Sequence, residues 1–531
     1  MDSILRVKNL SVTIEEEKLL DAISFNIKQG EIFALVGESG SGKSLTSLAI
    51  MQLLPEGIAV RSGDIFLKEQ SLFGLSESQM QHIRGKSIAM IFQEPMSALN
   101  PVMSVGSQVA EVLKVHLGLK KEQMKEKVLS LFREVALKDP EERYYWYPHQ
   151  LSGGQKQRVM IAIALACEPS LLIADEPTTA LDVTIQAQVL GLLKKICKER
   201  DLSILFITHD MAVVSQMADR VAVMKKGKIV EQAACEDFFT HPQHTYTKRL
   251  LEDAKAVKAH DKVDKAYDLL IEVEGLKVYF PIKKGFFQRT TGFVKAVDGV
   301  TFSIARGKTL ALVGESGSGK STIGKAILSL LNETQGSVRF GKENLVGLGK
   351  KALSPYRRKI QVVFQDPFSA LNPRMTIADI IREGMISLDV GPKERREQDV
   401  YIEALLLKVD LQSEHMHRYP HQFSGGQRQR IGIARALAVE PELIICDEPT
   451  SALDVSVRAQ ILKLLQKLQD ESGVSYLFIT HDLSIVPTIA DEVAVMREGK
   501  IVEQGCVEDV MKNPQHPYTQ NLLKSAPKMP M

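Results

Sequence analysis

The octapeptide GESGSGKS occurs twice in the sequence, at residues 37–44 and 314–321. Its glycines let backbone N–H groups curl around phosphates, its lysine can reach the β and γ oxygens, and its last serine can bind Mg²⁺. An ordinary glycine-rich turn would produce two such matches on the order of once in a thousand chains. The predicted ATP-binding residues are Gly37, Glu38, Ser39, Gly40, Ser41, Gly42, Lys43 and Ser44, and then Gly314, Glu315, Ser316, Gly317, Ser318, Gly319, Lys320, Ser321 and Thr322.

An Asp-Glu pair ends an apolar run in each half of the chain, in SLLIADE and in ELIICDE. Such a pair is costly to bury unless a cation accompanies it. We predict that Asp175 and Asp447 hold Mg²⁺ through water. Glu176 and Glu448 would orient and deprotonate the attacking water. The alternative is a carboxylate satisfied by its own strand end, which the nearby phosphate loop disfavours.

A glutamine and a histidine recur at matching places in the two halves. Gln93 and Gln365 follow strand-like runs, and a neutral amide can bind Mg²⁺ and sense the γ-phosphate. His209 and His481 follow FIT, each 33 residues after the predicted base, and we expect a contact with the γ-phosphate. A loop glutamine and a structural histidine are the alternatives. The predicted metal ligands are Ser44, Gln93 and Asp175, and Ser321, Gln365 and Asp447.

Short apolar runs must position these side chains. EIFALVG, SLLIADE and ILFITHD are typical of buried strands, and a helix is predicted from Lys43 onward. Residues 102–148 are amphipathic and charged, which predicts helices, and residues 220–232 predict a hairpin around Lys-Gly. The alternation indicates an α/β core with a largely parallel sheet and an inserted helical subdomain.

The chain is a duplication. Gln93 and Gln365, and likewise Ser152 and Ser424, are 272 residues apart, whereas Lys43 and Lys320 are separated by 277. We predict a first domain over residues 1–252, a linker over 253–269 and a second domain over 270–531. The linker, rich in Ala, Lys and Asp, could equally be a surface helix of the first domain.

Bulk composition excludes several classes of protein. The net charge of +2 over 531 residues gives no general positive excess for nucleic acid. The five cysteines form no CxxC pair, so we expect neither a structural zinc site nor a disulfide framework. The N-terminus has no secretory pattern, and no run approaches about 18 apolar residues. Any membrane role would therefore come through a partner.

The decapeptides HQLSGGQKQR and HQFSGGQRQR complete the pattern. A serine and two glycines that open a helix form an N-cap with exposed N–H groups, which is an anion site. With the motifs above, the chain resembles the nucleotide-binding domain of ABC transporters, in two copies and over nearly its whole length. The signature residues are Ser152, Gly153, Gly154 and Gln155, and Ser424, Gly425, Gly426 and Gln427.

The resemblance implies two tandem domains, each with a phosphate-loop core, an antiparallel β subdomain and a helical signature subdomain. Two such domains meet head to tail in this family. Ser152 and Gly154 would then cap the ATP on Lys320, and Ser424 and Gly426 the ATP on Lys43. The resemblance also implies an aromatic residue that stacks on adenine. At this position the second copy offers Phe280, whereas the first copy offers only Ile14.

FQ[ED]P-x-SALNP and the terminal HTYT and HPYT are similar to the peptide-importer class, and a fused pair of this length is most similar to Yej-type microcin C and oligopeptide importers. Thr245 replaces the usual proline in the first copy. The resemblance implies ATP and Mg²⁺, two membrane permeases, an extracytoplasmic peptide-binding protein, no nucleic acid and one fused ATPase chain per transporter. The chain would lie peripherally on the cytoplasmic face of the inner membrane.

Other soluble or fused ATPases of the family are alternatives. A tandem ABC protein acting on ribosomes usually has a long charged helical linker, whereas this linker is about 20 residues. A DNA-repair relative would show zinc-binding cysteines or coiled-coil insertions. A fused sugar-importer ATPase commonly has one degenerate site, and both sites here are intact in sequence.

Overall fold

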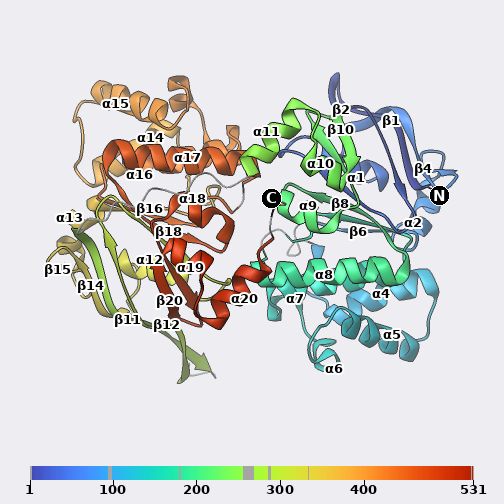
Figure 1. Ribbon diagram of the computed structural model, residues 1–531, viewed down its shortest axis with the longest axis horizontal. Coiled ribbons are helices and arrows are strands. Elements are labelled where there is room, and N and C mark those ends of the chain that lie inside the picture. Colours follow the sequence, from blue (N-terminus) through green and yellow to red (C-terminus); the bar gives the residue numbers. More distant parts are fainter. Residues whose placement is uncertain are drawn as a thin grey trace. The chain divides into compact units, whose positions relative to one another are not determined.

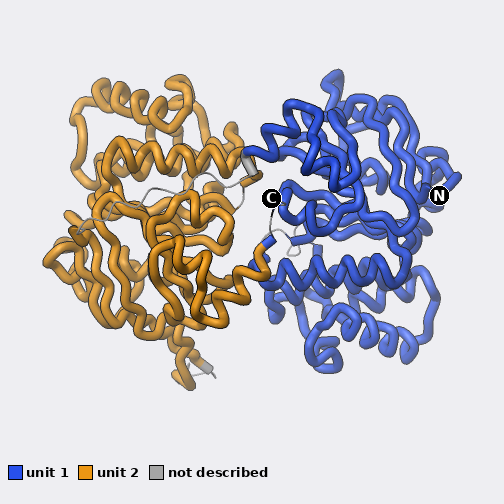
Figure 2. Tube along the Cα trace, in the orientation of Figure 1, with its two compact units in different colours: residues 1–255, 527–531 blue, residues 256–526 orange. Residues whose placement is uncertain are grey.

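The computed structural model describes residues 3–93, 98–178, 181–254, 268–284, 289–332, 334–451, 453–527 and 529. The chain divides into two compact units, unit 1 with residues 1–255 and 527–531 and unit 2 with residues 256–526 (Figure 2). Both units repeat one order of strands and helices (Figure 1). Residues 255–267 of the predicted linker lie outside the described residues, and the predicted domain bounds remain predictions.

The central sheet of unit 1 has the strand order β10-β9-β3-β8-β7-β6, parallel throughout except for the β9–β10 hairpin. A second, antiparallel sheet has the order β2-β1-β4-β5. The strand bounds are β1 Ser3–Ile14, β2 Glu17–Lys28, β3 Ile32–Val36, β4 Ile58–Leu67, β5 Gln70–Ser71, β6 Ile88–Ile91, β7 Leu171–Asp175, β8 Ser203–Thr208, β9 Arg220–Lys225 and β10 Lys228–Ala234.

Helices cover the central sheet of unit 1, and α4, α5 and α7 pack on one another as the helical insertion. The helix bounds are α1 Lys43–Ile50, α2 Glu77–Ile83, α4 Val105–Leu117, α5 Lys121–Glu134, α6 Pro140–Arg143, α7 Gly153–Leu165, α8 Val183–Arg200, α9 Met211–Met217, α10 Cys235–Thr240 and α11 Thr245–Ala254, with a 3₁₀ turn at Pro148–Gln150.

Unit 2 has the same two sheets, with strand orders β16-β17-β18-β13-β19-β20 and β12-β11-β14-β15. The strand bounds are β11 Leu269–Lys284, β12 Arg289–Ala305, β13 Thr309–Val313, β14 Thr334–Phe340, β15 Glu343–Asn344, β16 Ile360–Val363, β17 Leu443–Asp447, β18 Ser475–Thr480, β19 Glu492–Arg497 and β20 Lys500–Cys506. The helix bounds are α12 Lys320–Ile327, α13 Lys350–Lys359, α14 Ile377–Ser387, α15 Arg395–Lys408, α16 Gly425–Leu437, α17 Val455–Ser472, α18 Val486–Ile489, α19 Val507–Lys512 and α20 Pro517–Ser525, with 3₁₀ turns at Ser413–His417, Pro420–Gln422 and Leu483–Ile485.

Alternate residues of the central strands enter different cores. In unit 1, Leu172 and Ala174 of β7 pack with the helical insertion, whereas Leu171 and Ile173 pack with α1 and the antiparallel sheet. Both faces of these strands are thus buried. Apolar residues therefore occupy consecutive positions along each strand and do not alternate with polar ones. Their polar residues are therefore confined to the strand ends.

The predicted α/β fold with a largely parallel sheet is confirmed. The hairpin expected over residues 220–232 is β9–β10, and the stretch 102–148 contains α4, α5 and α6. The residues that follow Gln93, EPMS at 94–97, lie outside the described residues. In the part of the chain that is described, no helix has the length and apolar character needed to cross a bilayer.

Candidate active site

The phosphate loop of unit 1 connects β3 to α1. Gly42 has φ 104° and precedes Lys43, the first residue of the helix. Lys43 is buried, and its Nζ donates to the carbonyl oxygens of Gly37 at 2.8 Å and Glu38 at 2.9 Å. In unit 2, Lys320 Nζ makes the same bonds to Gly314 and Glu315, each at 2.8 Å. The loop therefore curls around its own lysine, at the helix end that favours anions.

The first glycine of each loop is required by a close approach. A Cβ at Gly37 would lie 2.3 Å from the carbonyl oxygen of Met224 on β9, and a Cβ at Gly314 would lie 2.2 Å from that of Met496 on β19. Any side chain would push the loop off the neighbouring strand. The loop is therefore supported by the strand that pairs with β3 or β13.

Two of the three predicted metal ligands, the serine and the aspartate, are brought together in each unit, whereas the glutamine bonds the predicted base. Ser44 Oγ donates to Asp175 Oδ1 at 3.2 Å, and Ser321 Oγ to Asp447 Oδ1 at 2.8 Å. Burial raises the pKa of Asp175 to about 6 and also raises that of Asp447. A buried carboxylate beside a hydroxyl is a hard-oxygen set of the kind Mg²⁺ prefers, and a cation would offset the cost of its charge.

The predicted base of each unit is held between the glutamine and the histidine. Glu176 accepts from Gln93 Nε2 at 2.9 Å, and its other oxygen lies 2.9 Å from His209 Nδ1. Glu176 has φ 48°, and its N–H donates to Ile207 of β8. This left-handed turn bends the chain at the end of β7, so that the carboxylate points across the strand ends toward the residues following β6 and β8.

Unit 2 repeats this cluster. Gln365 Nε2 donates to Glu448 Oε2 at 3.0 Å, and His481 Nδ1 lies 3.1 Å from the same oxygen. Burial acts to raise the pKa of Glu448, but the bond and charge of His481 outweigh it, so the pKa lies below its usual value. The carboxylate therefore stays ionised at neutral pH, as a proton acceptor must.

The signature motifs open α7 and α16 as capped helices. Ser152 Oγ accepts from Gln155 N at 3.4 Å, and Gln155 Oε1 accepts from Ser152 N at 3.0 Å, which is a capping box. Ser424 and Gln427 form the same box in unit 2. The predicted N-cap is confirmed, and the glutamine has a structural role that the sequence analysis did not assign to it.

The two glycines of each signature differ in what surrounds them. A Cβ at Gly154 would lie 2.6 Å from Ile185 Cγ2 of α8, whereas a Cβ at Gly153 would meet only Leu181 Cδ2 at 3.9 Å. In unit 2 a Cβ at Gly426 would lie 2.3 Å from Val457 Cγ1. The second glycine is therefore needed for helix packing, whereas packing does not require the first.

We expect Gly154→Ala to destabilise unit 1 by about 1–3 kcal/mol because it overpacks the α7–α8 contact. Gly153→Ala is the matched control and should leave the melting temperature almost unchanged, since it adds a methyl group in open space. Thermal unfolding of the two purified proteins without nucleotide makes the comparison. Equal melting temperatures for both variants would contradict the packing argument.

The predicted adenine-stacking position differs between the units. Phe280 lies in β11, half-buried against the core of unit 2. Ile14 ends β1 and is 37% exposed, so its side chain is not buried in the core of unit 1. The neighbouring aromatic residue of β11, Tyr279, donates its hydroxyl to Asp298.

Comparison with known proteins supplies the family. The model described as "ABC transporter" matches residues 20–179 and again residues 297–451. The chain belongs to the ABC transporter family. As a member of that family it is an ATPase with an ATP-binding domain in each unit. A second model, "Oligopeptide/dipeptide transporter, C-terminal region", matches residues 230–289 and 502–530.

Curated relatives in the ABC transporter family are similar over nearly the whole chain. A "Peptidoglycan transport ATP-binding protein YejF" of Agrobacterium fabrum is 45% identical, covering 98% of this chain and 96% of its own. The "Uncharacterized ABC transporter ATP-binding protein YejF" of Escherichia coli is 46% identical, with 98% and 99% covered. A "Glutathione import ATP-binding protein GsiA" of Salmonella paratyphi A is 45% identical, with 99% and 89% covered.

The terminal HTYT and HPYT stretches contain functional candidates that the sequence analysis missed. Each begins a helix, α11 or α20, and the tyrosine hydroxyl accepts a bond from the phosphate loop of its own unit: Glu38 N to Tyr246 at 3.4 Å, and Glu315 N to Tyr518 at 3.3 Å. The repetition of the tetrapeptide was the available signal. Thr245 replaces proline at the first position of α11. No hydrogen bond within the helix depends on the N–H at this position, so either residue can begin the helix.

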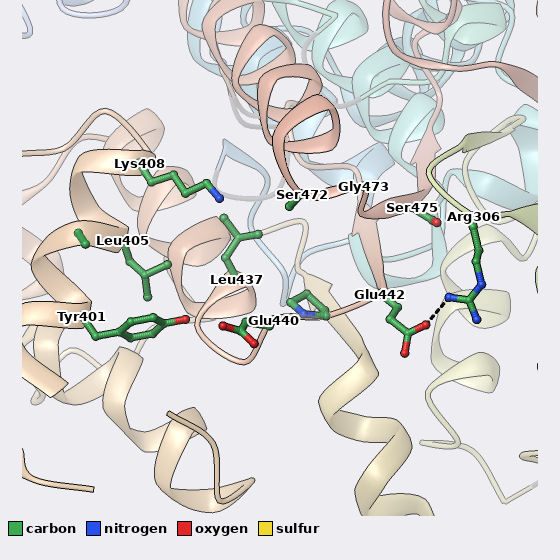
Figure 3. A pocket seen from close by; sticks show the side chains of 12 residues that line it. Arg306, Tyr401, Leu405, Lys408, Leu437, Glu440, Glu442, Ser472, Gly473 and Ser475 are labelled. Atoms are coloured by element: carbon green, nitrogen blue, oxygen red, sulfur yellow. Dashed lines mark hydrogen bonds and ion pairs between the residues drawn. The ribbon is translucent and has the colours of Figure 1, made fainter. Parts of the chain in front are cut away.

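A cavity of about 580 Å³ lies in unit 2, where the helical insertion meets the core (Figure 3). Tyr401 and Lys408 of α15 face Glu440, Glu442 and Ser472 across it. The described residues that line it include none of the predicted ATP-binding residues. We therefore do not assign this cavity to the nucleotide.

In unit 1, ion pairs connect α5 to neighbouring segments of the fold. Arg200 bonds Glu134 and Lys127 bonds Glu168, each at 2.5 Å. Ser472 stands 272 residues after Arg200, the spacing of the duplication. Ser472 cannot form the ion pair that Arg200 makes in unit 1.

Proposed function

We propose that the chain is the energy-coupling ATPase of an importer for short peptides or peptide-containing molecules. The observation that carries the proposal is the intact cluster of loop lysine, aspartate, glutamate, glutamine and histidine in both units, joined to a C-terminal region typical of oligopeptide and dipeptide transporters. Relatives named for glutathione import and peptidoglycan transport support the substrate class, because both substrates contain peptide bonds.

The residues near the phosphates would divide the work of hydrolysis. The loop N–H groups and Lys43 would bind the phosphates, and Ser44, Asp175 and Gln93 would hold Mg²⁺, which supplies positive charge to the phosphate oxygens. Glu176 would orient the attacking water and accept its proton. Because Gln93 and His209 both bond Glu176, they would fix its carboxylate and can respond to the γ-phosphate.

ATP would also drive the conformational cycle. We propose that ATP binding closes an intramolecular head-to-tail sandwich, in which Ser152 caps the ATP on Lys320 and Ser424 the ATP on Lys43, and that hydrolysis reopens it. The capped helix ends of α7 and α16 support this, since each presents N–H groups suited to a phosphate. One chain would supply both ATP sites of a transporter.

Transport requires partners. We propose two membrane permease subunits and an extracytoplasmic peptide-binding protein, with this chain peripheral on the cytoplasmic face of the inner membrane and no nucleic acid involved. The surface around Gln93 and Gln365 would transmit the closing motion to the permeases, because each of these two glutamines bonds the base of its own site.

The test is reconstitution. The chain is co-expressed with the hydrophobic proteins encoded beside it, purified and placed in liposomes with its binding protein. We expect co-purification and ATP hydrolysis that increases when di- or tripeptides are supplied. Co-purification with ribosomes instead would refute the peptide-import proposal. A rate of ATP hydrolysis that is unchanged by peptides and increased by sugars would also refute it.

The two sites should bind adenine unequally. Stacking on an aromatic ring contributes about 1–3 kcal/mol in nucleic-acid sites, so Phe280 should favour the site of unit 2 by roughly 5- to 150-fold, toward the lower end because adenine is only partly enclosed. ATP titration of Lys43→Ala and Lys320→Ala, each leaving one phosphate loop intact, measures the difference. Ile14→Tyr should narrow it. Equal affinities, or no response to Ile14→Tyr, would count against the asymmetry.

A further inference from the structure

Each unit ends in a helix whose buried tyrosine reaches its own phosphate loop. Tyr246 and Tyr518 are 7% and 8% exposed. They stand at the second position of α11 and α20, about 200 residues beyond the loops in sequence. Since the two copies have diverged in sequence elsewhere, a contact kept in both indicates a common requirement.

The segment that carries Tyr246 is fixed by charge-assisted bonds. Glu231 of β10 accepts from the N–H groups of Gln243 at 2.8 Å and His244 at 3.0 Å. His244 Nδ1 then accepts from Tyr246 N at 3.1 Å, which caps the first turn of α11. The backbone at Tyr246 is therefore anchored to the β9–β10 hairpin, in addition to the contacts of the tyrosine ring.

The contact in unit 1 reaches the phosphate-binding lysine through one peptide group. The peptide between Gly37 and Glu38 donates its N–H to Tyr246 Oη and accepts Lys43 Nζ at its carbonyl oxygen. A peptide group is planar and rigid, so fixing the N–H fixes the direction of the carbonyl. The Tyr246 contact thereby restrains the direction of one of the two carbonyl groups to which Lys43 donates.

Unit 2 reproduces the arrangement. Glu503 of β20 accepts from the N–H groups of Gln515 at 2.7 Å and His516 at 3.2 Å, and His516 caps Tyr518 N. The peptide between Gly314 and Glu315 bonds Tyr518 Oη on one side and Lys320 Nζ on the other.

A cation over each ring adds a second restraint. Lys225, the last residue of β9, has its Nζ 4.4 Å from the Tyr246 ring centre, and the Arg497 guanidinium carbon is 5.0 Å from that of Tyr518. Both cations lie next to the residue whose carbonyl supports the first loop glycine, Met224 or Met496. Strand, ring and loop therefore form one packed set, which restricts rotation of the peptide.

We propose that Tyr246 and Tyr518 are positioning residues that preorganise the phosphate loop, so that the C-terminal region of each unit sets the ATP affinity of that unit's own site. This rests on the proposed nucleotide site. Binding of phosphate to a flexible loop carries a free-energy cost, because the loop must become ordered. A loop that is already held in its binding shape avoids this cost, so it binds ATP more tightly.

The test isolates one site in the full-length chain. In a Lys320→Ala background, which leaves the loop of unit 1 intact, Tyr246→Phe removes only the hydroxyl. We expect ATP binding to weaken by about 2- to 10-fold, the effect of one hydrogen bond. Amide exchange should accelerate in the peptide that contains Glu38 and stay unchanged in the one that contains Glu315. Lys248→Ala, an exposed change on the same helix, is the control.

Tyr518→Phe in a Lys43→Ala background should reproduce the effect at the other site. Unchanged or tighter ATP binding by Tyr246→Phe, while its parent binds ATP normally, would overturn this inference and leave the proposed function intact. Failure of the Lys320→Ala parent itself to bind ATP would overturn both. A weakened affinity with a melting temperature equal to that of the parent would separate positioning from general stability.

Discussion

A protein carrying both Glu176→Gln and Glu448→Gln should bind ATP and hydrolyse it about 10²- to 10⁴-fold more slowly than the parent, because a positioned general base typically contributes that factor. Glutamine has the shape of glutamate and can still accept a bond from Gln93 or Gln365 through its carbonyl oxygen. Binding should therefore survive while proton transfer is lost. Phosphate release and ATP titration, each measured with the permeases present, separate the two steps.

The control for this experiment is Glu69→Gln. The side chain of Glu69 is 93% exposed, and Glu69 is not one of the predicted site residues. The substitution removes one surface charge and should leave hydrolysis at the parental rate. Near-normal turnover by the double variant would exclude Glu176 and Glu448 as the bases. The two single variants then show whether the sites hydrolyse independently.

The second large effect concerns the crossed sites. Ser152→Arg should abolish trapping of nucleotide on Lys320 while leaving nucleotide on Lys43 in place. Arginine cannot replace the serine in the capping box, and its bulk would occupy the phosphate position at the start of α7. The change lies in unit 1, but the proposed crossed arrangement would place its effect in unit 2.

The measurement is photolabelling with an azido-nucleotide trapped by vanadate, followed by cleavage in the linker and detection of the labelled half. Ser424→Arg is the matched reciprocal variant and should remove the label from the N-terminal half. If Ser152→Arg removed it from the N-terminal half alone, each signature would serve its own loop and the crossed proposal would be wrong.

Much of the candidate site was predictable because its parts are local. A Gly-x-x-x-x-Gly-Lys-Ser loop between strand and helix needs only its own backbone, and Ser152 caps α7 through a residue three positions away. The neighbourhood of Glu176, Gln93 and His209 was also foreseeable in outline. Each follows a strand of one parallel sheet, and parallel strands end at the same edge.

The pattern could not reveal which atoms pair at that edge. The spacing of Glu176 and His209 gave no indication that Nδ1 would bond the carboxylate or that Gln93 would hold its other oxygen. Side-chain directions there depend on the left-handed backbone of Glu176, a conformation that glutamate seldom adopts. The sequence offered a γ-phosphate contact for the histidine, and the structure adds the glutamate as its partner.

The sequence by itself therefore determined the duplication, the α/β class, the family and the residues at each strand end, since all of these are encoded in short periodic or contiguous stretches. Only the tertiary structure decided that Gly154 must be glycine because Ile185 approaches it, and that Tyr246 bonds a loop 208 residues earlier. The physical reason is that packing and hydrogen bonding between distant segments depend on how strands and helices are brought together, and residue types alone do not specify the partner.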